Sequence, residues 1–242
     1  MIAIFRKELT LFFSTLTGYV SGGLFLLLSA LFLWLLPGWG NVFETNIASL
    51  TPLFAMSPWL FLVLVPAVTM RMFAEEQREG TLELLASRPV PIWGIVLGKY
   101  FASLLLVVLM LLPTVIFALI LNEYVASASS LDLGATLGSY FGLLLLGAVY
   151  ASIGLFASTL TSNSVVAFLL GVLICVVVYV GFSEAALLFS GNAQYALSWL
   201  GIEEHYRSIR RGVVDTRDVL YFFSVVCLFL YFSVHTLKMR RR

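Results

Sequence analysis

Six apolar runs, each long enough to cross a lipid bilayer as a helix, dominate the sequence. A spanning helix needs about 20 consecutive, mostly apolar residues. The chain is 61% hydrophobic and its mean hydropathy is +1.02, whereas soluble domains contain about 45–50% apolar residues. We therefore expect an all-α integral membrane protein with a single transmembrane domain over residues 1–242 and no separate soluble domain. The six predicted spans are residues 19–36, 53–72, 95–121, 135–158, 164–184 and 219–237.

The segment before the first apolar run has the pattern of an amphipathic helix. Arg6 and Lys7 ahead of an apolar run could also begin a secretory signal peptide. The run from Tyr19 to Leu36 has 18 residues, however, and a signal core has roughly 7–15 and is followed by a small-x-small cleavage site that is missing here. Residues 1–14 are expected to lie in the membrane interface or, alternatively, to extend the first span into the cytosol. Apolar and polar residues recur there at helical spacing: Ile2, Phe5, Leu9, Phe12 and Phe13 against Arg6, Lys7, Glu8 and Thr10.

The distribution of basic residues predicts the orientation of the spans, because cytoplasmic loops carry an excess of Lys and Arg. With both termini in the cytoplasm, ten of the 14 basic residues fall on the cytoplasmic face. The outer loops 37–52 and 122–134 contain none. One outer loop, 185–218, is discordant, because it has four arginines together with four acids. The cytoplasmic basic residues are Arg6, Lys7, Arg71, Arg78, Arg88, Lys99, Lys238, Arg240, Arg241 and Arg242.

A dense group of charges from Arg71 to Arg88 separates the second and third apolar runs. One Lys, Arg or Asp at the bilayer centre costs about 2.5–3.5 kcal/mol on insertion scales, so this segment must protrude into water. Gly80 is expected to end a helix that continues from the second span, and Thr81 to cap a new, short one. We expect a cytoplasmic helix that lies along the membrane and offers apolar side chains to a soluble partner. The alternative is that the charges only fix the orientation of the loop.

The same loop and its flanks resemble the permeases of the ABC-2 family. The resemblance is carried by Glu-Glu-Gln-Arg-Glu-Gly-Thr-Leu-Glu-Leu-Leu at 75–85, Arg-Pro-Val at 88–90 and Ile-Val-Leu-Gly-Lys-Tyr at 95–100. It extends over essentially the whole chain, including the amphipathic start and a late segment, 205–218. The branch it resembles is the one found in gliding-motility and nitrous-oxide-reductase-maturation operons.

This resemblance implies a half-transporter that dimerises, with itself or a related permease, and rests on two separately encoded ATPase subunits. It implies an exporter in a bacterial inner membrane, with ATP and Mg²⁺ bound in the partner ATPase and no cofactor in this chain. The chain itself has no G-x-x-x-x-G-K-[ST] phosphate-binding loop. By resemblance, Phe5, Arg6, Lys7 and Glu8 belong to a connecting helix. The coupling helix that contacts the ATPase comprises Glu76, Glu79, Gly80, Thr81, Leu82, Glu83, Leu84, Leu85 and Arg88.

The long outer segment 185–218 is the second region of interest. Asp215 is expected to cap the last span, with Asp218 completing a capping-box-like pair, and Gly212 to adopt a left-handed conformation after a helix that ends at Arg211. The resemblance implies short outer helices that cover the pathway. The acidic and basic residues of segment 185–218 either pair with one another or contact an anionic cargo. The predicted lid residues are His205, Arg210, Arg211, Gly212 and Asp215.

Glycines and aromatic residues within the spans leave two questions open. Gly134, Gly138 and Gly142 have the four-residue spacing that permits close helix approach, either within one protomer or across a dimer. Cargo is not identified either, because Phe25, Phe61 and Phe141 are compatible with a hydrophobic pathway and with ordinary packing.

Several other functional classes are disfavoured by the sequence. His205 and His235 are predicted on opposite faces of the membrane, so they cannot act together in an enzyme, and Cys175 and Cys227 lack metal-ligand spacing. A net charge of +1 gives no reason to expect nucleic acid. A secondary transporter would expose acids within its spans, and only Glu184 comes close. The remaining alternative is an ATP-driven motility or assembly machine, with a periplasmic or motility partner, that moves no solute.

Overall fold

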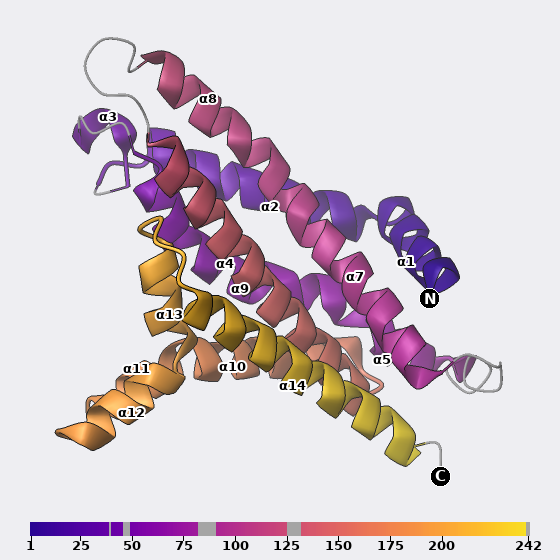
Figure 1. Cartoon of the computed structure of the whole chain (residues 1–242). Coiled ribbons are helices and arrows are strands. Elements are labelled where there is room, and N and C mark those ends of the chain that lie inside the picture. The colour runs from indigo at the N-terminus through magenta and orange to yellow at the C-terminus, as the bar shows by residue number, and fades with distance from the viewer. Residues whose placement is uncertain (39, 46–48, 82–90, 125–131, 241–242) are drawn as a thin grey trace.

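The computed structural model describes residues 1–38, 40–45, 49–81, 91–124 and 132–240 (Figure 1). Throughout these ranges the regular structure is helical. The elements are α1 (Ile2–Ser14), α2 (Leu16–Ala30), the π-helix η1 (Leu31–Leu35), α3 (Val42–Thr45), α4 (Thr51–Thr69), α5 (Arg71–Arg78), α7 (Ile92–Leu111), the 3₁₀ helix η2 (Leu112–Thr114), α8 (Val115–Tyr124), α9 (Leu133–Leu160), α10 (Ser164–Val176), the π-helix η3 (Val177–Gly181), α11 (Phe182–Ala186), α12 (Asn192–Leu200), α13 (Ile202–Ile209) and α14 (Thr216–Arg240).

Six of the helical stretches are long and apolar enough to cross a membrane, as the sequence predicts. Each coincides with one predicted span: the first is shifted by one residue, and the other five extend the predicted span at one or both ends. The second exceeds its predicted range by the largest number of residues, because α5 follows α4 almost without interruption. The six stretches are Gly18–Leu35, Thr51–Arg78, Ile92–Glu123, Leu133–Leu160, Ser164–Ala186 and Thr216–Arg240.

The fourth span, α9, is the central helix of the bundle. It packs against α4, α7, α10 and α14, and most of its length is buried, whereas the first and fifth spans are largely exposed. The exposed side chains of those outer spans include Leu24, Leu27 and Leu169. An apolar exterior is what a lipid environment requires, because lipid tails are as apolar as leucine.

Backbone irregularities mark several of the spans. Pro113 lies in η2, where the third span changes to a 3₁₀ helix; proline has no N–H to donate and so disturbs the helical ladder. Pro58 and Pro66 lie inside α4. The first and fifth spans contain the π-helices η1 and η3, a rare form that often occurs at functional sites.

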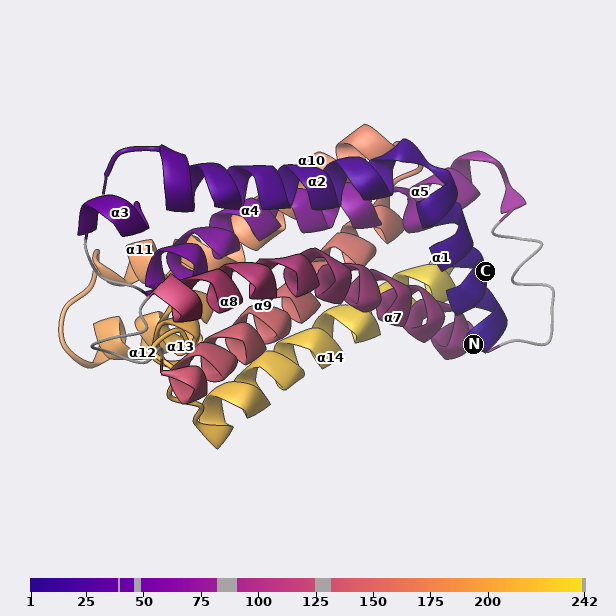
Figure 2. The same cartoon turned by 90° about the horizontal axis from the view of Figure 1, so that it is seen from above.

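Figures 1 and 2 show two well-separated ends of the bundle. One end carries both termini, α1 and α5, and the other carries α3 and the short helices α11, α12 and α13. Both termini therefore lie at the end from which the charged segment emerges. Phe25 and Phe61 lie within the core and are fully buried, with ring centroids 5.0 Å apart, so these two aromatic residues serve packing.

Candidate functional site

A cluster of four charged side chains connects α1, α5 and α7 at the end that carries the termini. Its centre is Lys99 on α7, whose side chain is only 1% exposed. The Lys99 Nζ donates to Glu8 Oε1 at 2.6 Å and to the Met72 carbonyl oxygen at 2.6 Å, and it lies 3.0 Å from Glu76 Oε1. Since a buried charge is stable only when it is paired and hydrogen-bonded, these contacts fix the position of Lys99.

Glu76 on α5 bridges two lysines. Its Oε1 accepts from the Lys7 Nζ at 2.8 Å and also faces Lys99. Two lysines and two glutamates balance, so the cluster is electrically neutral as a group. Burial lowers the pKa of Lys7, but the hydrogen bond to Glu76 and the charges of Glu76, Glu8 and Glu79 outweigh that effect and raise the pKa above its ordinary value. Lys7 therefore remains positively charged throughout the physiological pH range.

Gly98 on α7 allows α1 to pack closely against α7. A Cβ at Gly98 would lie 3.1 Å from the Met1 carbonyl oxygen and 3.2 Å from the Ile4 Cβ. Only a residue without a side chain allows the two helices to approach so closely without displacement. Because Lys99 follows Gly98 directly, this contact brings Lys99 within reach of Glu8 on α1.

A second set of contacts ties the other side of α5 to α9 and α14. The Gln77 Nε2 donates to the Thr159 carbonyl oxygen at 3.1 Å and lies 3.4 Å from that of Ser158, at the end of α9. The Gln77 Oε1 accepts from Arg240 at the end of α14, and Arg240 also donates to the Leu160 carbonyl oxygen at 2.6 Å. Thus α5 is joined to α1 and α7 through Glu76, and to α9 and α14 through Gln77.

The predicted docking segment is described only in part. Gly80 has φ +69° and directly follows the C-cap of α5, so the predicted helix end is confirmed. Glu79 is exposed and Glu76 is buried, and the Thr81 hydroxyl lies 3.4 Å from the Glu76 carbonyl oxygen. The remaining predicted contact residues lie outside the described part of the chain: Leu82, Glu83, Leu84, Leu85 and Arg88.

Residues 2–14 form the predicted N-terminal helix, α1. Arg6 is exposed and Phe5 is half-buried. The expected placement of Glu8 on the polar face is wrong, because Glu8 is buried against Lys99. The sequence patterns did not predict the structural roles of Lys99 and Gln77. Lys99 did carry a signal, since an ionisable residue several positions inside an apolar run suggests a site.

At the opposite end, His205 on α13 is fixed between two other elements. Its Nδ1 lies 2.7 Å from Asp218 Oδ1 and its Nε2 lies 2.9 Å from the Trp199 carbonyl oxygen, while its ring stacks on Tyr221 with centroids 3.9 Å apart. Asp215 Oδ1 accepts from the Arg217 N–H at 2.9 Å, as expected for a cap. The second half of the predicted capping box is wrong, because Asp218 is buried beside His205 instead.

Two glycines of α9, Gly138 and Gly142, allow α13 and the turn after it to pack closely against α9 within the same protomer. A Cβ at Gly138 would lie 2.9 Å from the Gly212 carbonyl oxygen, and one at Gly142 would lie 2.5 Å from Ile209 Cγ2. Ser139 donates to the Arg210 carbonyl oxygen at 2.9 Å. The open question about the glycine spacing is therefore answered for these two positions: they permit packing inside the protomer.

Some of the mixed charges of the outer segment pair with one another. Arg207 lies 3.1 Å from Glu203 and 3.3 Å from Glu204. Gly212 has φ +82°, the predicted left-handed conformation, although α13 ends at Ile209 rather than at Arg211. Arg211 is exposed. Of the two short helices, α13 packs against α9 and α14, whereas α12 buries none of its side chains.

Six helices long and apolar enough to span a membrane, with a neutral cluster of charged side chains at one end, define a multi-pass integral membrane protein. The charged segment that follows the second span is linked to several of the other helices. Residues 44–236 match the family model described as ABC-2 family transporter protein. The chain therefore belongs to the ABC-2 family of transporter proteins. Members of this family are permease components of ABC systems and are generally non-catalytic, and membership implies an ABC ATPase partner and typically a pair of permeases. No match was found among curated proteins.

Proposed function

We propose that this chain is the membrane-spanning half of an ABC exporter in a bacterial inner membrane, of the gliding-motility or nitrous-oxide-reductase-maturation type. It pairs with a second permease, either another copy or a related chain. Separately encoded ATPase subunits bind ATP and Mg²⁺ and drive the export. The 75–88 loop contacts the ATPase, and α1 lies beside it as the connecting helix.

The observation that carries this proposal is the double attachment of α5. A loop that only oriented the protein during insertion would need surface charge and no links to other spans. Here the two residues Glu76 and Gln77, adjacent in sequence, join α5 to α1, α7, α9 and α14. A bound subunit that displaced α5 would therefore pull on four other helices, α1, α7, α9 and α14, through these contacts. This is the mechanical link that an ATP-driven permease requires.

Docking would use residues just after that link. Glu79 is exposed at the end of α5, and the sequence continues with a second acid, Glu83, among three leucines. Apolar side chains in a helix suit an apolar groove, while the acids would favour a basic rim on the ATPase by complementary charge.

We expect the double substitution Glu79→Lys with Glu83→Lys to release the ATPase from the permease. Reversing two charges at a complementary interface replaces attraction with repulsion, and such like-charge contacts cost several kcal/mol, which is a loss of at least about 100-fold in affinity. The measurement is the amount of ATPase subunit that co-purifies with the tagged permease in mild detergent.

The matched control carries the same change of net charge at the other end of the bundle. Glu123 and Glu184 are exposed acids there, and their replacement by Lys should leave the co-purified ATPase unchanged. Full retention of the ATPase by the Glu79/Glu83 variant would refute docking through this loop.

The proposed orientation predicts a labelling pattern for two engineered cysteines. In a background without Cys227, which is exposed, Ser190→Cys should react with a membrane-impermeant maleimide in intact spheroplasts. Ser87→Cys, which lies outside the described residues, should react only after the membrane is opened. The reverse pattern would overturn the orientation with both termini in the cytoplasm.

A further inference from the structure

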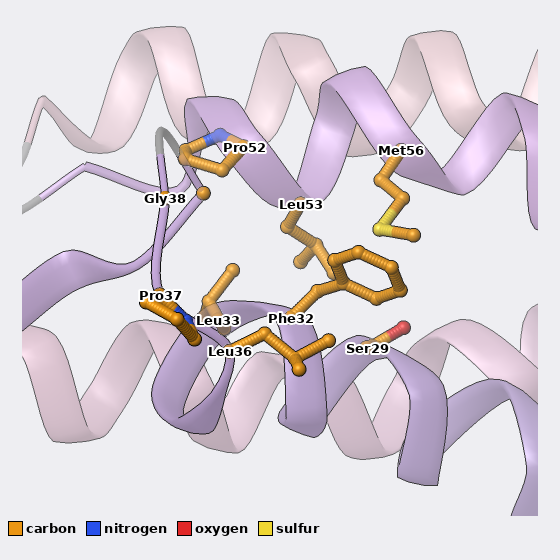
Figure 3. A pocket seen from close by; sticks show the side chains of 10 residues that line it. Ser29, Phe32, Leu33, Leu36, Pro37, Gly38, Pro52, Leu53 and Met56 are labelled. Atoms are coloured by element: carbon orange, nitrogen blue, oxygen red, sulfur yellow. The ribbon is translucent and has the colours of Figure 1, made fainter.

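A pocket of about 200 Å³ lies between the end of the first span and the start of the second. The chain segments that line it lie at the end of the bundle opposite the charge cluster, close to α3 (Figure 2). One wall consists of Ser29 and the π-helix η1 with the residues after it, and the other comes from the first turns of α4 (Figure 3). The described lining residues are Ser29, Phe32, Leu33, Leu36, Pro37, Gly38, Gly40, Pro52, Leu53 and Met56.

Ser29 supplies the single polar side chain among these lining residues. Its side chain is 2% exposed, and its Oγ has no hydrogen-bond partner in the described part of the structure. Figure 3 shows the hydroxyl beside the Phe32 ring, on the side that faces Met56. A buried hydroxyl without a hydrogen-bond partner costs free energy. A bound molecule that supplied this partner would remove the cost.

The other buried serines show that this arrangement is unusual. In membrane helices, serine normally donates to a carbonyl oxygen three or four residues earlier. Seven of the eight buried serines that the structure describes do so, and only Ser29 does not. The seven are Ser21, Ser57, Ser103, Ser139, Ser152, Ser158 and Ser233.

The size and lining of the pocket restrict what can fill it. One water takes up about 30 Å³ of liquid volume, so a single ordered water would not fill the pocket. An apolar cavity of about 150 Å³ accommodates a molecule as large as benzene, so this pocket accepts a short alkyl chain. No charged side chain is among the described lining residues, which argues against a charged group as the ligand.

From these observations we infer that the pocket between η1 and α4 binds one alkyl chain that carries a hydroxyl or carbonyl oxygen, and that this oxygen hydrogen-bonds to Ser29. Such a group occurs at the ester of a glycerolipid and in free uncharged amphiphiles. This inference stands apart from the proposed coupling to an ATPase, because it concerns binding to the permease alone.

The test uses azi-octanol, a photoreactive alcohol, on the full-length permease in nanodiscs of ether-linked phosphatidylglycerol, which lack ester carbonyls. Labelling followed by peptide mapping should locate the probe on the pocket residues between Ser29 and Met56. Ser29→Ala should raise the half-saturating probe concentration about fivefold, the loss expected for one hydrogen bond. Met56→Trp, which fills the pocket, should abolish saturable labelling.

Ser57→Ala is the matched control, because Ser57 is equally buried but donates to the Leu53 carbonyl oxygen at 2.7 Å. It should leave probe binding unchanged and lower the melting temperature. Without probe, Ser29→Ala should leave the melting temperature unchanged or raise it, since it removes an unpaired hydroxyl. If Ser29→Ala lowers the melting temperature as Ser57→Ala does, and leaves labelling intact, the proposed site is refuted.

A second lipid distinguishes the two sources of the ligand. In nanodiscs of ester-linked phosphatidylglycerol, a loss of saturable labelling would identify the lipid ester as the occupant. Unchanged labelling would identify a free amphiphile as the occupant. Labelling spread over the lipid-facing surface in both lipids, equally in the wild type and in Met56→Trp, would contradict the site altogether.

Discussion

Lys99→Met should destabilise the permease by about 3–5 kcal/mol, the cost of breaking a buried ion pair by removing one partner. The substitution keeps the volume of the side chain but leaves Glu8 without its lysine and Glu76 with Lys7 alone. Both carboxylates are largely buried, at 8% and 10% side-chain exposure. For a chain of this length the loss corresponds to a fall of roughly 6–20 °C in the melting temperature, measured by heating the purified protein and quantifying the soluble fraction.

Two further variants separate charge from packing. Arg71→Met removes a partner from the exposed pair of Arg71 with Glu75, and we expect a change of at most about 1 kcal/mol. Combining Lys99→Met with Glu8→Gln removes the one carboxylate that has lost its lysine and keeps the pair of Lys7 with Glu76, so it should recover part of the lost stability. If Lys99→Met alone melts at the same temperature as Arg71→Met, the cluster does not hold α1, α5 and α7 together.

Gly212→Ala should be the most damaging small substitution at the opposite end. A Cβ there would lie 2.3 Å from the Ala135 Cα and 2.6 Å from the Ala135 Cβ, and the residue has φ +82°. The left-handed conformation costs about 1–2 kcal/mol for a residue with a side chain, and the overlap with the α9 backbone adds roughly 1–3 kcal/mol. We expect α13 to shift away from α9, which lowers the melting temperature and exposes the α12–α13 segment to protease.

Two glycines serve as graded controls for that substitution. Gly191 has φ +71°, but no atom lies within 4 Å of the position that a Cβ would occupy there, so Gly191→Ala should show the conformational cost alone. Gly22 in α2 has neither a positive φ nor such a neighbour within 4 Å, so Gly22→Ala should cost nothing. Equal stability of the Gly212→Ala and Gly191→Ala variants would show that close packing of α13 on α9 is not required.

The six spans are predictable because each depends on its own composition. A run of about 20 apolar residues must cross the bilayer whatever its neighbours do, so the predicted and observed ranges agree closely. Gly80 and Gly212 were predictable for a similar reason, since a local backbone conformation that favours glycine needs no tertiary context.

The charge cluster was not predictable, because its partners are distant in the sequence. Glu8 and Lys99 are separated by 91 positions, and their contact depends on the close approach of α1 at Gly98. Asp218 fits a local capping pattern, yet its carboxylate reaches His205, 13 positions away. In each case a tertiary contact with a buried partner is preferred over the local alternative, because a buried charged or polar group requires a partner.

The most direct test of the proposed function is an affinity purification of the tagged chain from its native membrane in mild detergent, followed by an ATP hydrolysis assay. We expect a soluble ATPase subunit to co-purify in stoichiometric amount and to hydrolyse ATP in the complex. A permease that purifies alone, with no nucleotide hydrolysis, would contradict the proposal that a separate ATPase drives these six spans through the loop after α5.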